Sequence, residues 1–486
     1  MDVELLSRLQ FALTIMFHYV FVPFSIGTGL LLVIFEIMYF RTRKKVYEKI
    51  TRFWIKIFAA NFSIGVATGI VMEFEFGTNW STYSRFVGDV FGSPLAAEGI
   101  FAFFLESGFL AVLLFGWNRV KPGFHLFSTV MVFLGSLLSA FWIIAANSWM
   151  QTPAAYEVVT NPETGLQRAV ITDFWGMVFN PSTMIRFTHT VFGAFIQGAF
   201  LIASVSAWYI WKGKYLDFAR RSFTVAMVVG LVVSVAQVPL GHISAQVVAE
   251  HQPVKLAAME GVYNTQKGAA LTMIGHTDPE TQETWGLEAP GLLSWLAFGD
   301  ASAEIKGLNE VPKDEWPDVP MVFHSFHIMV ALGFLFIGAT ALSLFLIWRR
   351  RFFHNKLLQR FWVLAVILPI IANQLGWLTA ERGRQPWAVQ DLLKVSDSIS
   401  PSVTAGEVLT SLIMFGILYT LLLFVWIYVL NKEITHGPAE FYDDTDDADE
   451  LYRERRERVH KIFGPGAAEA SENFESPQDP QHDTTH

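Results

Sequence analysis

The sequence predicts an all-α fold, a polytopic membrane bundle of about nine transmembrane helices. The composition is 52% hydrophobic and only 16% charged, whereas soluble domains carry about 25% charged residues. Apolar runs of about 20 residues or more, long enough to span a bilayer, recur along most of the chain. The sequence has no cysteine, which excludes disulfides, thiolate metal sites, iron–sulfur clusters and covalently attached c-type haem. Any metal or cofactor would therefore be held by His, Met, Asp or Glu.

The apolar runs define nine expected spans. The first run lacks the basic leader of a signal peptide and is too long for one, so we expect a retained span. Ser93-Pro94 and Asn180-Pro181 each place a capping side chain before a first-turn proline, which predicts helix starts there. The expected spans are about 12–40, 53–76, 94–117, 124–149, 182–211, 220–247, 321–348, 360–380 and 404–431.

Basic residues indicate how these spans are oriented. They are concentrated in alternate loops, and the loops between them, including the long segment 249–320, are poorer in Lys and Arg. Because basic loops stay on the cytoplasmic side, the N-terminus is predicted outside and the C-terminus inside. The basic loops are 41–52, 117–125, 212–221 and 349–360.

The expected domain organisation has two parts. Residues 1–431 form a transmembrane domain with an outer loop at about 248–320, and residues 432–486 form a polar, acidic, disordered cytoplasmic tail. The net charge of −9 comes from an acidic excess in that loop and tail. It says little about nucleic acid, and we expect no nucleic-acid partner.

Ionisable and sulfur-containing side chains within the spans are the candidates for function, because a carboxylate at the bilayer centre costs roughly 2.5–3.5 kcal/mol. Depth follows from counting about 1.5 Å per residue outward from the inner end of each span, against a core of about 30 Å. Glu98 lies at about 28 Å by this count, whereas Glu106 lies alone at about 16 Å, near the middle. Four potential iron ligands on four spans share one outer layer at about 29–33 Å: His18, His189, Met329 and Glu381.

Each of these residues also has an ordinary structural interpretation. A single histidine near a span end is usually an interfacial or packing residue, Met329 alone would be core filler, and Glu381 could pair with Arg382 or Arg384. The residues alone predict an outer-leaflet metal or haem layer and a buried, proton-handling Glu106, without naming a cofactor. Other histidines near the same layer are equally possible ligands on these grounds: His242, His324 and His327.

Eight motifs are specific enough to indicate a family. In sequence and in order they resemble subunit I of cytochrome bd quinol oxidase, over nearly the whole chain up to about residue 431. The interval between Glu260 and the next span resembles the short form of that family's quinol-binding loop. The motifs are SRLQFALTIMFHYVFVP, GVATGIVMEFEFGTNWS, GSPLAAEGIFAFFLES, LSAFWIIAANSWMQTP, FTHTVFGAF, VKLAAMEG, FHIMVALGF and GWLTAERGRQPW.

The resemblance implies three haems and their ligands. His18 and Glu381 match ligands of the two high-spin haems at the oxygen-reducing site, which the family fills with a high-spin haem b and haem d. Which of the two each residue holds is left open. His189 and Met329 match the axial ligands of the low-spin haem b, where a thioether raises the potential of the iron.

The resemblance also implies roles for five further residues. Glu98 and Glu106 match acids associated with the high-spin site and with proton delivery to it. Lys255 and Glu260 match residues of the quinol-binding loop. Arg384 is expected to pair with a haem propionate or with Glu381 itself.

The implied activity is that of a quinol:oxygen oxidoreductase, of the translocase class, in the bacterial cytoplasmic membrane. Quinol, either ubiquinol or menaquinol, would be oxidised at the outer face, and O2 would be reduced to water with protons taken from the inside. This contributes to the proton-motive force without pumping. The family also implies a second, homologous membrane subunit and, in some members, small single-span subunits.

Two alternatives remain from the residues. A haem-b membrane anchor would pass quinone electrons to another subunit, but nothing in such an anchor requires a Glu381 ligand. A proton-coupled transporter could use Glu106 as a relay, but it should show inverted repeats, and none stands out in the sequence.

The chain departs from the family pattern at two positions. His327 stands two residues before Met329, where we expect Arg, and places a competing imidazole beside that ligand. Glu75, in MEFEF, stands where some members have an uncharged amide.

Overall fold

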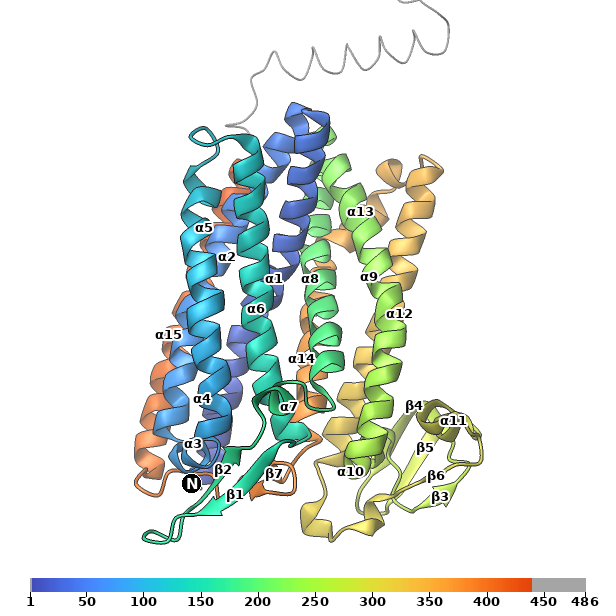
Figure 1. Ribbon diagram of the computed structural model, residues 1–486. Coiled ribbons are helices and arrows are strands. Elements are labelled where there is room, and N and C mark those ends of the chain that lie inside the picture. Colours follow the sequence, from blue (N-terminus) through green and yellow to red (C-terminus); the bar gives the residue numbers. More distant parts are fainter. Residues whose placement is uncertain (1, 439–486) are drawn as a thin grey trace, which may run out of the picture. The chain divides into compact units, whose positions relative to one another are not determined.

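The structure is a computed structural model that describes residues 2–438. Most of the expected tail, from residue 439 on, therefore lies outside the described residues. Within residues 2–438, nine helical segments are long and apolar enough to cross a membrane, which confirms the predicted membrane-helical fold (Figure 1). These segments are Val3–Thr42, Lys45–Thr78, Gly88–Phe115, Pro122–Gln151, Thr183–Lys212, Leu216–His251, Lys313–Trp348, Lys356–Arg382 and Ala405–His436.

Most helical elements follow one another with short connections; the longer connections, 152–173, 261–318 and 383–404, carry the strands. A π-helical segment, η1 (Glu98–Phe103), interrupts the third span. The α-helices are α1 (Val3–Thr42), α2 (Lys45–Thr78), α3 (Ser81–Phe86), α4 (Gly88–Ala97), α5 (Phe104–Phe115), α6 (Pro122–Gln151), α7 (Phe174–Val178), α8 (Thr183–Lys212), α9 (Leu216–His251), α10 (Pro253–Glu260), α11 (Leu292–Phe298), α12 (Val319–Trp348), α13 (Lys356–Leu364), α14 (Ile367–Arg382) and α15 (Ala405–His436).

The strands pair two by two and gather at one end of the bundle, which we call the strand end (Figure 1). All four pairs are antiparallel. The strands are β1 (Tyr156–Thr160) with β2 (Gln167–Ile171), β3 (Gln266–Lys267) with β6 (Glu304–Ile305), β4 (Leu271–Asp278) with β5 (Glu283–Ala289), and β7 (Trp387–Val389) with β8 (Leu393–Lys394).

Capping chemistry explains several helix starts. The Asp2 carboxylate accepts from the Glu4 backbone N–H at 3.1 Å and caps α1, as expected for an N-cap aspartate. The predicted start at Ser93-Pro94 is wrong, because α4 already begins at Gly88 and Pro94 lies inside it. A proline removes one backbone donor and strains the preceding turn, and the π-helical turn begins four residues later.

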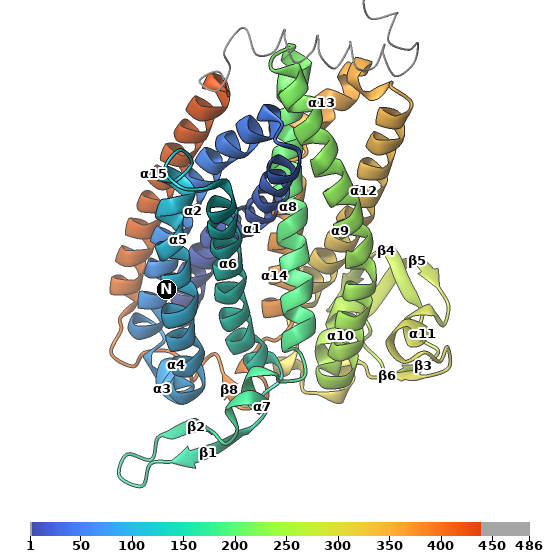
Figure 2. The same ribbon diagram turned by 45° about the horizontal axis from the view of Figure 1, so that its top comes forward.

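Helix α8 forms the centre of the bundle and α15 its edge (Figure 2). The most apolar stretch of α8 is 83% buried, against 11% for that of α15. Gly27 of α1 and Gly198 of α8 face each other so closely that a Cβ on either would overlap the backbone of the other. Such small residues are what allow membrane helices to approach at backbone distance.

Candidate functional site

Glu381 lies at the strand end of α14 and its carboxylate is bonded on both oxygens. Arg384 Nη2 donates to Oε2 and forms an ion pair with it. Asn147 Nδ2 and Gln151 Nε2, both from α6, donate to Oε1 at 3.1 and 3.3 Å. Arg186 of α8 donates to the Asn147 side-chain oxygen at 2.6 Å. A carboxylate between two guanidinium groups is thus held as a fixed negative charge.

Lys255 reaches the same cluster from α10. Its Nζ donates to Gln151 Oε1 at 2.9 Å and to the Ala380 carbonyl at 2.9 Å. Burial, reinforced by the charge of Arg186, holds the pKa of Lys255 well below its usual range. The predicted loop residue is therefore an interior residue, separated from Glu381 by one amide.

Glu260, at the end of α10, is the other predicted loop residue. It is 6% exposed, and its Oε2 has no hydrogen-bond partner within residues 2–438. Burial raises the pKa of this carboxyl to about 8, because an apolar environment disfavours the charged form. A carboxyl with such a pKa can gain or lose a proton near neutral pH.

His189 and Met329 project from α8 and α12 toward glycines on the neighbouring helices. A Cβ on Gly241 of α9 would approach His189 Cε1 to 3.6 Å, and one on Gly376 of α14 would approach Met329 Sδ to 2.9 Å. Gln237 donates to the His189 carbonyl at 2.9 Å, while His189 Nδ1 is buried without a partner in the described chain. Two potential axial ligands thus face glycine-lined surfaces on different helices.

His18 lies on α1, directed at α2. Its Nδ1 is 2.9 Å from the Thr68 hydroxyl, which orients the imidazole. A Cβ on the next residue, Gly69, would approach His18 Cε1 to 3.2 Å. This is again a histidine that packs on a glycine.

Glu98 and Glu106 both turn toward α6. Ser139 donates to Glu98 at 2.5 Å and Ser136 donates to Glu106 at 2.5 Å. The two residues are eight positions apart, which on an ideal α-helix would place their side chains about 80° apart around the axis. The wider turns of the π-helical segment η1 between them change this angle. Each of the two carboxylates therefore accepts a hydrogen bond from a serine hydroxyl of α6.

The departures from the family pattern have structural partners. His327 Nδ1 is 2.8 Å from the Phe323 carbonyl and its Nε2 is 2.7 Å from the Thr272 carbonyl. A carbonyl oxygen only accepts, so both bonds form together only when both ring nitrogens carry hydrogen. Both ring nitrogens thus have backbone partners, so neither is available as a ligand that competes with Met329. Glu75 accepts from Thr14 at 2.7 Å, and its second oxygen is buried without a partner in residues 2–438.

These residues suit the haems that the motifs imply. His189 Nδ1 is unpartnered within residues 2–438, and a glycine lies beside each of His189, Met329 and His18, so no side chain of that neighbour stands against these ligand candidates. Arg384 is 4% exposed, and its Nε and Nη1 have no hydrogen-bond partner in the described chain. Two buried guanidinium donors of this kind suit an anion such as a propionate, because leaving charged donors unpaired is costly.

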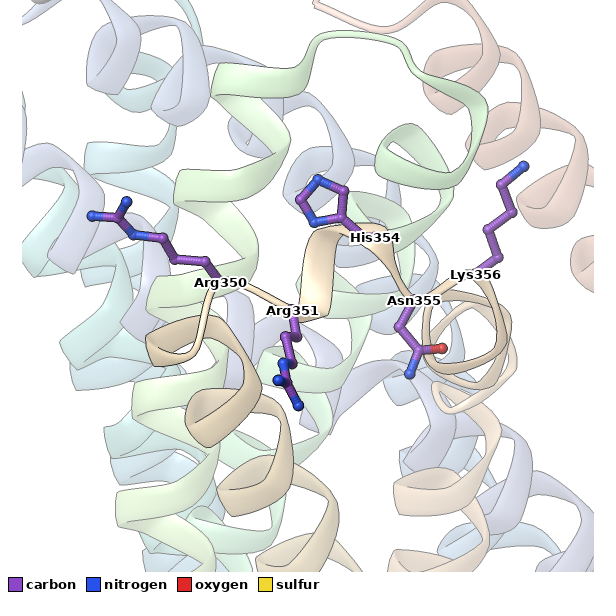
Figure 3. Close-up of a pocket in the computed structure, with 5 residues that line it drawn as sticks. All are labelled: Arg350, Arg351, His354, Asn355 and Lys356. Carbon is purple, nitrogen blue, oxygen red and sulfur yellow. The ribbon is translucent and has the colours of Figure 1, made fainter.

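A surface pocket lies at the other end of the bundle and has different chemistry. It is lined by Arg350, Arg351, His354, Asn355 and Lys356, in the turn between α12 and α13. The side chains of Arg350 and Lys356 point in different directions (Figure 3). They do not converge on one ligand, and none is a predicted site residue.

Three residues around Glu381 were not predicted from the sequence: its partners Asn147 and Gln151, and Arg186, which binds Asn147. Arg186 gave a usable signal, since a basic residue three positions before His189 in an apolar span is itself unusual. Asn147 and Gln151 are neutral amides, and nothing in their spacing indicates which carboxylate they bind.

Comparisons with known proteins agree with the motifs. The family model for cytochrome bd terminal oxidase subunit I matches residues 6–438. The chain is 39% identical over 443 residues to the cytochrome bd ubiquinol oxidase subunit 1 of Bacillus subtilis (strain 168), covering 89% of this chain and 93% of that relative. It is 36% identical to the cytochrome bd-II ubiquinol oxidase subunit 1 of Escherichia coli (strain K12), covering 90% and 97%.

A solved structure gives the same result for the fold. The structure of bd oxidase from Geobacillus thermodenitrificans superposes with a TM-score of 0.84 at 30% identity, covering 90% of this chain and 99% of that one. The family, the membrane-helical fold and the oxidoreductase class predicted from the sequence are confirmed.

Proposed function

The chain belongs to the family of cytochrome bd terminal oxidase subunit I, and from this membership we propose that it is the haem-bearing subunit of a quinol:oxygen oxidoreductase. It oxidises membrane quinol at the strand end, taken as the outer face, and reduces O2 to water with protons from the inside. It contributes to the proton-motive force without pumping. The observation that carries this proposal is the direct connection of the loop residue Lys255, through Gln151, to the Glu381 carboxylate.

Glu260 acts on the proton released by quinol. Its carboxyl is buried and has a pKa of about 8, so its ionised form accepts a phenolic proton near neutral pH. Lys255 is fixed by Gln151 and the Ala380 carbonyl, where it stabilises the negative charge that develops on the deprotonating ring.

Glu381 and Arg384 form the anionic and cationic parts of the oxygen-reducing site. Glu381 and His18 would hold the two high-spin haems, a haem b and haem d, and His189 with Met329 would hold the low-spin haem b. When bound, these haems supply the electron-transfer and oxygen chemistry. Arg384 keeps Glu381 ionised and offers its remaining N–H groups to a propionate.

Glu106 and Glu98 carry protons toward that site. Ser136 and Ser139, about one turn apart on α6, orient the two carboxylates. Within residues 2–438, neither Glu98 nor Glu106 forms an ion pair with a basic side chain. Each can therefore exchange a proton without breaking an ion pair. Through them, protons drawn from the inside would reach the residues that would hold the haem pair, His18 and Glu381.

The proposed setting is the bacterial cytoplasmic membrane, with the N-terminus outside and the C-terminus inside. The printed names of the relatives describe a subunit 1, and the proposed partner is a second, homologous membrane subunit. Small single-span subunits are a further proposed partner.

A reduced-minus-oxidised absorption spectrum of the purified complex tests the function. We expect bands of b-type haem together with a chlorin-type band of haem d. A spectrum without haem would refute the oxidase. Bands of b-type haem alone would favour a membrane anchor that passes quinone electrons to another subunit.

The ligand assignment has its own test in Met329→Leu. The loss of the thioether should remove the low-spin signal and quinol oxidation, while carbon monoxide still binds the high-spin site. Met414→Leu, at an exposed methionine of α15, is the matched control and should leave both signals unchanged. Retention of the low-spin signal with loss of carbon monoxide binding would contradict the assignment.

A further inference from the structure

Two histidines outside the proposed haem and proton sites face each other at the strand end. His276 lies on β4 of the outer loop, and His324 lies near the start of α12. Nδ1 of His276 and Nε2 of His324 are 3.0 Å apart. Two neutral imidazoles make this contact by placing one proton between the two nitrogens, and either ring can be the donor.

A metal ion can take the place of that proton. Zinc binds imidazole nitrogen at about 2.0–2.1 Å, and a tetrahedral ion therefore separates two such nitrogens by about 3.3 Å. The observed 3.0 Å differs from this by a few tenths of an ångström. The two rings are stacked, with 28° between their planes, so binding one ion requires the side chains to rotate until both nitrogens point at it.

The surroundings hold the two rings in place and leave them accessible. Trp285, the cross-strand neighbour of His276, packs against its ring at 5.1 Å between centroids. Phe323 packs edge-on against His324 at 5.3 Å. His276 lies in the exposed class of residues and His324 is half-buried, so an ion can enter from solvent and retain water as its remaining ligands.

We infer that His276 and His324 form a binding site for a divalent transition-metal ion of the zinc class. Imidazole ligands suit zinc, copper and nickel, whereas calcium and magnesium prefer oxygen. The two ligands come from the outer loop and from α12, so the bound ion ties the β4–β5 hairpin to that helix. His327 and the Thr272 carbonyl already join the same strand and helix at 2.7 Å, and the metal adds a second point of attachment.

Zinc binding to the purified complex tests the site. Equilibrium dialysis against zinc chloride, with the metal counted by elemental analysis, should find one more zinc in the wild type than in His276→Ala or His324→Ala. Because each ligand carries a share of the affinity, either variant should bind this zinc about tenfold more weakly or worse. His251→Ala is the matched control, since it removes an exposed imidazole at the end of α9. Equal zinc content in the wild type and both variants, or an equal loss in His251→Ala, would overturn the site.

Hydrogen exchange tests the attachment of the hairpin separately from the oxidase activity. Zinc should slow amide exchange in β4 and β5 of the wild type and leave His276→Ala and His324→Ala unchanged. The haem spectrum of each variant confirms that it is folded. Unchanged exchange in the wild type with zinc bound would overturn the proposed attachment.

Discussion

Glu381 and Glu106 are both carboxylates inside the bundle, but their partners differ in charge. Glu381 is bonded to Arg384 and, through Asn147, connected to Arg186. Glu106 is bonded to the hydroxyl of Ser136. A carboxylate among guanidinium groups is stabilised as an anion, whereas one beside a hydroxyl can be protonated without leaving a buried cation unpaired. The charge of the hydrogen-bond partner thus distinguishes Glu381, a fixed anionic ligand, from Glu106, a proton carrier.

The largest expected effect follows from removing the fixed anion. Glu381→Ala leaves Arg384 and Arg186 without their counter-charge, which typically costs about 3–5 kcal/mol for a buried pair. We expect lower thermal stability and loss of one high-spin haem, measured by haem content and by the absorption spectrum. Asp318→Asn is the control, since the Asp318–Arg382 pair is partly exposed and such pairs contribute about 0–1 kcal/mol. Normal haem content in Glu381→Ala would exclude this residue as a ligand.

The next effect concerns the proton carrier. Glu106→Gln keeps the shape and the Ser136 partner but cannot release a proton. Positioned acid–base groups typically contribute about 10²–10⁴-fold, so we expect oxygen consumption to fall by about 10²-fold or more with haem content retained. Glu407→Gln, at an exposed carboxylate near the start of α15, should consume oxygen at the wild-type rate. Unchanged turnover in Glu106→Gln would remove Glu106 from the proton path.

A third test concerns Glu260, which is buried and whose pKa burial alone raises to about 8. The quinol step needs the ionised carboxylate, so its rate should rise with pH up to about 8 and level off above it. Below that value the ionised fraction falls about tenfold for each pH unit. Glu260→Gln should slow quinol oxidation and remove this limb from the pH profile of kcat. A limb that persists in the variant belongs to another group.

The fold was more predictable than the contacts of the site. Apolar runs and basic loops carry a strong signal because the bilayer dictates the length and polarity of each span. The predicted depths put Glu381 and His18 in one layer, because the depth of a residue within a span follows from the rise per residue of an α-helix alone. They could not reveal that Lys255 is buried against Gln151, because Lys255 lies on the short helix α10, outside the spans from whose ends depth is counted. The start expected at Pro94 failed because a proline inside a helix and one in its first turn have the same local sequence.

Glu75→Gln has the smallest expected effect and shows whether a hydroxyl partner is sufficient for proton transfer. Glu75 accepts from Thr14 of α1, much as Glu106 accepts from Ser136, but the hydroxyl partners of Glu106 and Glu98 both lie on α6. Glu75 is buried, but glutamine keeps an oxygen acceptor for Thr14 and this residue forms no charge pair within residues 2–438, so the substitution should cost no more than the roughly 1 kcal/mol that is typical of point mutations. We expect oxygen consumption and the melting temperature to stay close to those of the wild type. If Glu75→Gln slows turnover as strongly as Glu106→Gln, a hydroxyl-bonded carboxylate on α2 also carries protons. A hydroxyl partner on α6 would then be unnecessary for proton transfer.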